Sequence, residues 1–220
     1  MSHAARTDPP LPGVIRSFDF PAVHKDRLDN GLEMRSVQAH RLPIVTVTLM
    51  LDAGEASVSE DRAGLAVLTG DSLEGGTATH SGTELAEALE SIGAGLSVGT
   101  GWDATTVSLS CLPERLDEAM NILADVVLRP AFPADEIDRV RGQRLAAIQQ
   151  RKMDPSSIAS DAARRLTYAE VTPYGRSLGG DVESVESFSP EAASGFVEAQ
   201  YRPENAGLIL VGDVDQAEVK

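Results

Sequence analysis

Four histidines are the side chains of this protein most suited to metal binding or to acid–base catalysis. They are His3, His24, His40 and His80. Two histidines that share a metal on one helix stand three or four residues apart, and no pair here has that separation. We therefore interpret His3, His24 and His40 as residues of loops or of the protein surface.

His80 has two acidic neighbours, Asp71 and Glu74, near the end of a predicted helix. Two carboxylates and an imidazole form a donor set that suits a divalent metal ion. Residues 75–77 separate these donors, however, and no helical spacing places all three on one face. A divalent-metal hydrolase with its site near Asp71, Glu74 and His80 stays open as an alternative function.

Nucleophilic side chains are present without the surroundings that activate them. Ser72, Ser81 and Ser110 lack the Gly-x-Ser-x-Gly turn of serine hydrolases. Cys111, the single cysteine, ends an apolar stretch and is interpreted as a buried structural residue. One cysteine also excludes an internal disulfide framework and a zinc site built from several thiolates.

The glycine-rich segment 93–101 has the composition of a phosphate-binding loop but not its context. Such a loop follows a strand and opens a helix. Here a predicted helix precedes the glycines and a predicted strand follows them. Nucleotide binding is therefore not expected.

Composition places the chain among ordinary globular proteins and narrows its partners. The 220 residues are 42% hydrophobic and 24% charged, which excludes collagen-like, coiled-coil and wholly disordered chains. The net charge of −15 disfavours nucleic acid and anionic membranes as partners. No apolar run approaches the roughly 20 residues of a membrane span. Residues 1–13 contain no apolar signal segment, which predicts a cytoplasmic location.

Hydrophobic periodicity and turn residues predict the elements that would position these side chains. Asn30-Gly31 is a strong hairpin signal between two short strands. The predicted strands are residues 24–29, 32–37, 43–52, 96–100, 105–111 and 206–213. The predicted helices are residues 63–73, 83–92, 113–127, 134–152, a segment after Pro155 that ends near Leu166, and one that begins at Ser189. This order predicts an α+β fold with a largely antiparallel sheet and helices packed on one face.

The ends of the chain predict its domain organisation. Pro9, Pro10 and Pro12 argue against helix or sheet at the start, so residues 1–20 are expected to form a flexible tail. Residues 21–220 are expected to form one domain. The chain stops just after its last predicted strand, so we expect this domain to be the first half of a longer two-domain chain.

Short motifs in order along residues 23–215 resemble the M16 zinc peptidase family, which includes insulinases, pitrilysins and mitochondrial processing peptidases. Tyr201-Arg202-Pro203-Glu204-Asn205 and Val211-Gly212-Asp213-Val214 are the most specific of them. The other matching segments are residues 28–32, 45–54, 63–66, 74–77, 93–106 and 173–176. The resemblance implies the fold of an M16 metallopeptidase domain, from the N-terminal half of the family unit.

The family's catalytic motif, His-x-x-Glu-His, is absent from this chain. The two histidine positions match Val67 and Asp71, the glutamate base matches Gly70, and the third zinc ligand matches Ala147. One carboxylate does not make a zinc site, so the resemblance implies no metal and no cofactor in this chain, with zinc only in a partner subunit. Gly70 is expected inside a helix, where alanine would be neutral or stabilising provided that its methyl group does not clash.

The resemblance therefore implies a catalytically inactive domain that helps to enclose peptide substrates. Its partners would be peptides and either a zinc-bearing M16 subunit or its own C-terminal half. Peptides would add a strand to an exposed sheet edge, for which the candidate residues are Leu96, Ser97, Val98 and Gly99. Besides the relocated metal site, a structural or assembly subunit without peptide processing is the other alternative.

Overall fold

The computed structural model describes residues 13–14, 17–168 and 172–215. Residues 13–14 and 17–23 carry no helix or strand. Most of the predicted tail over residues 1–20 lies outside the described residues, so its flexibility stays a prediction. Within the described ranges, no helix is both long enough and apolar enough to cross a membrane.

Six strands form one sheet in the order β1-β2-β6-β3-β5-β4. Their bounds are β1 His24–Arg27, β2 Glu33–Gln38, β3 Val45–Leu51, β4 Gly95–Thr100, β5 Thr105–Cys111 and β6 Ala206–Gly212. The β2–β6 pair is parallel and the other four neighbouring pairs are antiparallel. The predicted α+β class with a largely antiparallel sheet is confirmed.

The alternating sequence of β3 explains its place near the centre of the sheet. Val45 and Val47 are fully buried on the core face. Thr46 and Thr48 point to the other face, where their hydroxyls hydrogen-bond Ser110 and Ser108 of β5 at 3.0 Å. Cross-strand pairs of this kind stabilise a sheet and fix its register.

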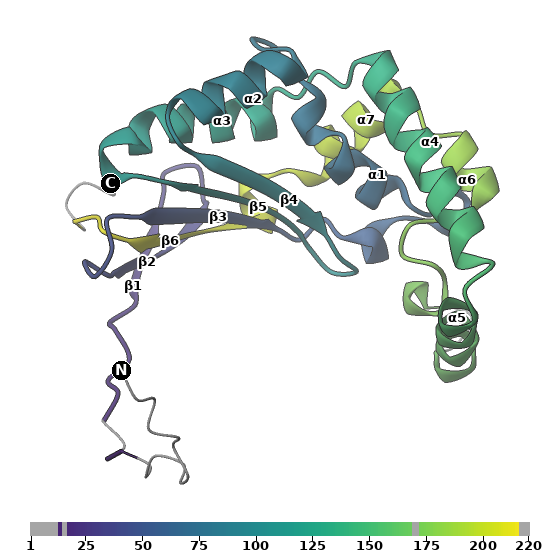
Figure 1. The fold of residues 1–220 in the computed structure, drawn as a ribbon, viewed down its shortest axis with the longest axis horizontal. Coiled ribbons are helices and arrows are strands. Elements are labelled where there is room, and N and C mark those ends of the chain that lie inside the picture. The colour runs from purple at the N-terminus through teal and green to yellow at the C-terminus, as the bar shows by residue number, and fades with distance from the viewer. Residues whose placement is uncertain (1–12, 15–16, 169–171, 216–220) are drawn as a thin grey trace, which may run out of the picture.

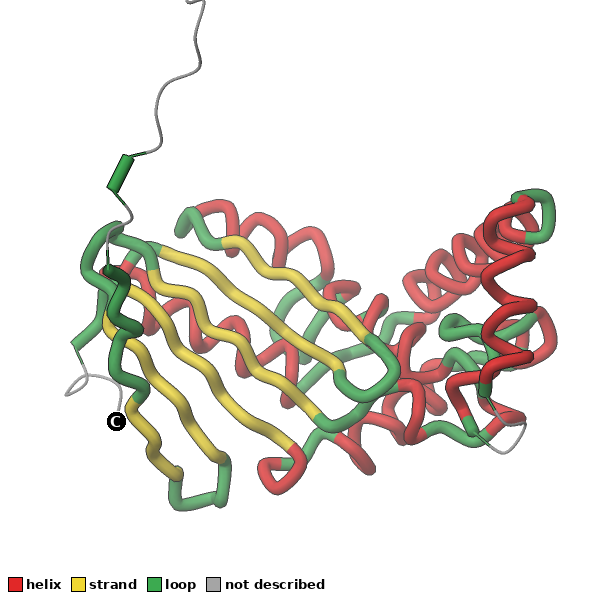
Figure 2. The backbone as a smooth tube through the Cα atoms, turned by 90° about the horizontal axis from the view of Figure 1, so that it is seen from below, coloured by secondary structure: helices red, strands yellow, loops and turns green. Residues whose placement is uncertain are grey.

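Seven α-helices complete the described part of the fold. Their bounds are α1 Leu65–Asp71, α2 Gly82–Ser91, α3 Leu116–Leu128, α4 Ala134–Arg151, α5 Pro155–Thr167, α6 Val182–Glu186 and α7 Pro190–Gln200. Figure 1 shows α2 and α3 over one face of the sheet, with α1 between the sheet and α4. Figure 2 views the molecule from below and shows the strands in front, with helices behind them and at one end.

Side-chain caps explain where four of the seven described α-helices begin. Ser81 and Glu84 form a capping box at the start of α2, and Asp154 and Ser189 cap α5 and α7. The predicted helix over 63–73 is shorter in the structure, because Gly64 has a left-handed φ of 90° and α1 begins only after it. The helix α6, which has only five residues, was not predicted from the sequence.

Candidate functional site

The start of α1 is fixed by contacts from distant segments. The backbone N–H of Gly64 donates a 2.5 Å hydrogen bond to Oε1 of Glu55, which is fully buried. A Cβ at Gly64 would lie 2.8 Å from the carbonyl oxygen of Gly179, so only glycine allows this approach. Arg176 donates to the carbonyl oxygens of Glu55 and Val58. The position of α1 is therefore set by tertiary contacts.

Burial shifts the titration of Glu55. Desolvation raises its pKa to about 7, although the Gly64 N–H and the Arg176 guanidinium act in the opposite direction. Its second carboxylate oxygen, Oε2, has no hydrogen-bond partner among the described residues. The carboxyl group thus supports the start of α1 and titrates near neutrality.

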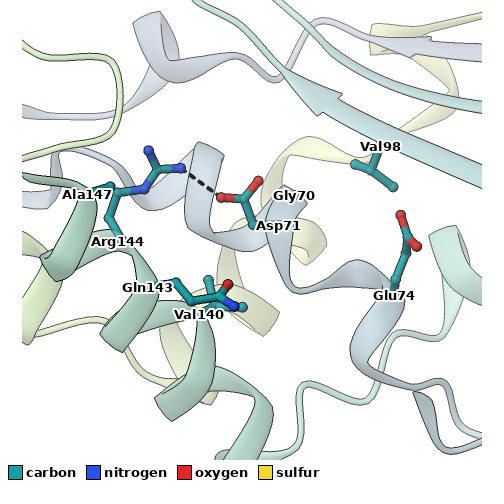
Figure 3. A pocket seen from close by; sticks show the side chains of 8 residues that line it. All are labelled: Gly70, Asp71, Glu74, Val98, Val140, Gln143, Arg144 and Ala147. Atoms are coloured by element: carbon teal, nitrogen blue, oxygen red, sulfur yellow. Dashed lines mark hydrogen bonds and ion pairs between the residues drawn. The ribbon is translucent and has the colours of Figure 1, made fainter. Parts of the chain in front are cut away.

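Two adjoining cavities lie between α1, α4 and β4, and together we call them the α1–α4 cleft. The first, the Glu74 cavity, has a volume of about 460 Å³. Figure 3 shows the residues that line it, which are Gly70, Asp71, Glu74, Val98, Val140, Gln143, Arg144 and Ala147. The second, the arginine cavity, has a volume of about 390 Å³. Both cavities are lined by Asp71, Arg144 and Ala147.

The α1–α4 cleft contains all four positions that the sequence resemblance matched to the zinc motif. Gly70, Asp71 and Ala147 line the Glu74 cavity, and Val67, Asp71 and Ala147 line the arginine cavity. The helices α1 and α4 therefore face each other as the family resemblance implies. Of these four positions, only Asp71 has a side chain with a metal-binding atom.

An ion pair lies in the lining that the two cavities share. Nη2 of Arg144 lies 2.7 Å from Oδ2 of Asp71, as the dashed line in Figure 3 marks. Arg144 stands one helical turn before Ala147 on α4. It also lies against the backbone of Gly179, where a Cβ would come within 2.6 Å of Nη1. Arg144 was not among the predicted site residues, although its i,i+3 spacing from position 147 was a signal for it.

Gly70 lies inside α1 as expected, but the space beside it is taken. A Cβ at this position would overlap Oγ1 of Thr100 and would lie 3.7 Å from Cγ1 of Val98. The Thr100 hydroxyl is in turn held by a 3.0 Å hydrogen bond to Thr105. The expectation that alanine is tolerated at position 70 was conditional on free space, and the structure contradicts that condition.

The α1–α4 cleft does not fit zinc. Valine, glycine and alanine offer no donor atoms at three of the four matched positions, and the guanidinium of Arg144 occupies the one carboxylate that remains. Across the described ranges, no group of three or more histidine, cysteine, aspartate or glutamate side chains could hold a metal ion. We therefore derive no chemical step through zinc in this chain.

The alternative metal site near Asp71, Glu74 and His80 is not formed. Asp71 pairs with Arg144, whereas Nδ1 of His80 lies 2.8 Å from the Thr79 hydroxyl and 3.7 Å from Oδ2 of Asp125. Glu74 is an exposed residue overall, but its carboxyl group lines the cleft, where desolvation raises its pKa. Among the described residues these three side chains do not form a group that could hold a metal ion, which contradicts the alternative of a relocated metal site.

Cys111 has the buried position that the sequence predicted. The residue ends β5, it is 4% exposed, and desolvation raises the pKa of its thiol. A buried thiol with a raised pKa is a weak nucleophile. Cys111 is thus a structural residue.

The candidate peptide-binding residues lie on β4, which is an outer strand of the described sheet. β4 pairs only with β5, from Gly95 opposite Ser110 to Thr100 opposite Thr105. Leu96 and Val98 pack against the core, while Ser97 and Gly99 are exposed. Val98 also lines the Glu74 cavity, so this edge of the sheet borders the α1–α4 cleft.

This fold and this cleft, with its four matched positions, correspond to one protein family. Residues 34–181 match the family model described as insulinase (peptidase family M16). The chain belongs to the M16 peptidase family. Membership by itself does not establish catalysis, because a family is defined by its fold and sequence pattern and activity depends on the residues of the site.

Solved structures agree with the family assignment. The peptidase M16 inactive domain from Pseudomonas fluorescens superposes with a TM-score of 0.85 at 28% identity, over 90% of this chain and 48% of that one. The first half of the periplasmic protease PqqL from Escherichia coli superposes with a TM-score of 0.80 at 25% identity, over 90% and 44%. The domain thus resembles the N-terminal half of the family unit.

A curated relative is named as a probable peptidase subunit. The probable mitochondrial-processing peptidase subunit beta from Arabidopsis thaliana is 25% identical over 199 residues, which cover 90% of this chain and 37% of that protein. The chain therefore spans about half or less of the length of the proteins it matches.

Proposed function

We propose that this domain binds extended peptides along the outer edge of β4 and forms one wall of a chamber in which a partner supplies the zinc. One observation carries the proposal: the outer edge of β4 borders a cleft that contains the four matched positions but lacks the zinc ligands. A family fold that keeps the cleft without the metal donors retains the means to bind a peptide but not to activate water.

Peptide binding at this edge follows from backbone chemistry. The outer edge of β4 presents N–H and C=O groups that an added strand can pair with, in a way that tolerates many sequences. Because Val98 belongs to both β4 and the Glu74 cavity, a peptide beside β4 would pass over the cleft and in front of Asp71. Ser97 and Gly99 are small, which leaves room for the side chains of such a peptide.

The partner would be either a zinc-bearing M16 subunit or the C-terminal half of the same polypeptide. The relative that is named as a subunit beta and the limited coverage of the longer relatives support this part of the proposal. Zinc would then be a cofactor of the partner only. A cytoplasmic location also stays a prediction.

Peptides with alternate backbone methylation test the β4 edge. In a strand, alternate N–H groups point to opposite sides, so methylating every second nitrogen blocks pairing in one register and leaves it intact in the other. Two such peptides with one sequence act as matched controls for each other. We expect one to lose binding to the full-length protein and the other to keep it. Equal binding of both would overturn pairing at the edge.

Reconstitution tests the role of the partner. The full-length protein is mixed with a zinc-bearing M16 subunit from the same source, and complex formation and peptide hydrolysis are measured. We expect a complex whose peptidase activity exceeds that of the zinc-bearing subunit alone. A complex with unchanged activity would instead indicate that the protein is a structural or assembly subunit. The absence of any complex would indicate that the partner is the C-terminal half of the same polypeptide.

A further inference from the structure

Three arginines line the arginine cavity: Arg144 and Arg151 on α4, and Arg164 on α5. Two carboxylates face them. Asp71 pairs with Arg144 at 2.7 Å, and Oδ1 of Asp161 lies 2.7 Å from Arg151 and 3.4 Å from Arg164. One carboxylate is thus shared between two guanidinium groups, which leaves an excess of one positive charge around the cavity.

The surrounding sequence strengthens this local excess. Residues 134–167, which span α4 and α5, include seven of the 19 basic residues of the chain and five of its 34 acidic residues. This segment therefore carries a small positive net charge in a chain whose net charge is −15. A basic wall in an acidic protein attracts anionic ligands to one place and disfavours them elsewhere on the surface.

The three guanidinium groups are also held in place, and they have N–H donors left for a ligand. A guanidinium has five N–H donors, and among the described residues each of the three makes only one side-chain hydrogen bond. Arg144 is fixed between Asp71 and the backbone of Gly179. Val67, Ala147 and Ile148 form apolar walls, which lower the local dielectric constant and strengthen a charged contact.

The cavity lies at the end of the proposed peptide path. Thr100, the last residue of β4, lines it together with Asp71 and Arg144. A peptide paired with β4 would therefore place a side chain or its own terminus at the mouth of the cavity. Guanidinium groups bind carboxylates with paired, charge-assisted hydrogen bonds.

We propose that the arginine cavity binds a carboxylate of the peptide, so that the domain selects peptides with an acidic side chain or a C-terminal carboxylate at this position. The inference rests on the proposed function, since it names the class of peptide that the β4 edge would accept. Arg144, Arg151 and Arg164 are its specificity-determining residues.

The test uses four fluorescent peptides of one extended sequence, with glutamate or glutamine at a central position and with a free or amidated C-terminus. Their dissociation constants for the full-length protein are measured by anisotropy. We expect a carboxylate to improve binding about tenfold over its neutral counterpart. A preference for glutamate identifies the side chain as the source, and a preference for the free C-terminus identifies the terminal carboxylate. The preference should shrink in high salt, which screens exposed charges.

Matched variants test whether the preference for a carboxylate depends on the arginine cavity. Arg164→Gln, and separately Arg151→Gln, should abolish most of the preference for a carboxylate. Arg115→Gln is the control, because Arg115 pairs with Glu118 outside the cavity and the variant makes the same change in net charge. Arg115→Gln should keep the full preference.

The outcomes separate the two proposals. Equal binding of all four peptides to the unmodified protein would overturn carboxylate selection and leave peptide binding at β4 intact. A preference that survives in both arginine variants would also overturn the role of the cavity. Failure of all four peptides to bind would overturn the proposed function, and carboxylate selection with it.

Discussion

Replacing Gly70 by alanine tests how closely β4 approaches α1. In an unobstructed helix the change stabilises the folded state by about 1 kcal/mol. At Gly70 the new methyl group would overlap the Thr100 hydroxyl, and Cβ of Thr100 is only 3.4 Å away. Overpacking of this kind costs roughly 1–3 kcal/mol. Rotation of Thr100 would also break its 3.0 Å hydrogen bond to Thr105, a loss of about 1 kcal/mol.

The sum predicts that Gly70→Ala lowers the free energy of unfolding by about 2 kcal/mol, or roughly 4–8 °C in Tm for a chain of this size. Urea denaturation and thermal melts measure both quantities. Gly142→Ala is the control, because Gly142 lies inside α4 and a Cβ added there would have no atom within 4 Å, so the change should be stabilising by about 0.5–1 kcal/mol. Adding Thr100→Ala to Gly70→Ala should recover part of the loss. A Gly70→Ala protein that is as stable as Gly142→Ala would refute the close approach.

Three further predictions concern the metal and the buried carboxyl group. After dialysis against zinc, elemental analysis should find less than one zinc per chain, and one tightly held zinc would contradict the reasoning from the donor set. The combined changes Val67→His, Asp71→His, Ala147→Glu and Arg144→Ala should create weak zinc binding by calorimetry, because three donors then face one cavity; restoring Arg144 should abolish it. The pKa of Glu55 is about 7 in the folded state and near 4.5 in the unfolded state, so between these pH values only the folded state keeps the proton. The contribution of Glu55 to the free energy of unfolding therefore falls by about 3 kcal/mol as the pH rises from 4.5 to 7. Glu55→Gln should flatten that fall in urea denaturation series, and equal slopes for both proteins would argue against the raised pKa.

Much of the fold was predictable because its signals are local. The alternation of apolar residues and threonines in β3 defined a half-buried strand, and Ser81 with Glu84 marked the start of α2. The helix α6 was missed because five residues are too few to show a helical period. Its local signal was the reciprocal cap between Asp181 and Ser184.

The sequence by itself also determined that the chain has no His-x-x-Glu-His motif, because residue types need no structure to be read. Only the tertiary structure decided which contacts form at the matched positions. Arg144 reaches Asp71 across 73 residues of sequence, and Thr100 fills the space beside Gly70 from another strand. Periodicity and capping depend on residues that are neighbours along the chain, so they can be read from the sequence. The contacts of Arg144 and Thr100 depend on how α1, β4 and α4 pack together. That packing, and not the separation in sequence, sets the distance between side chains on different elements.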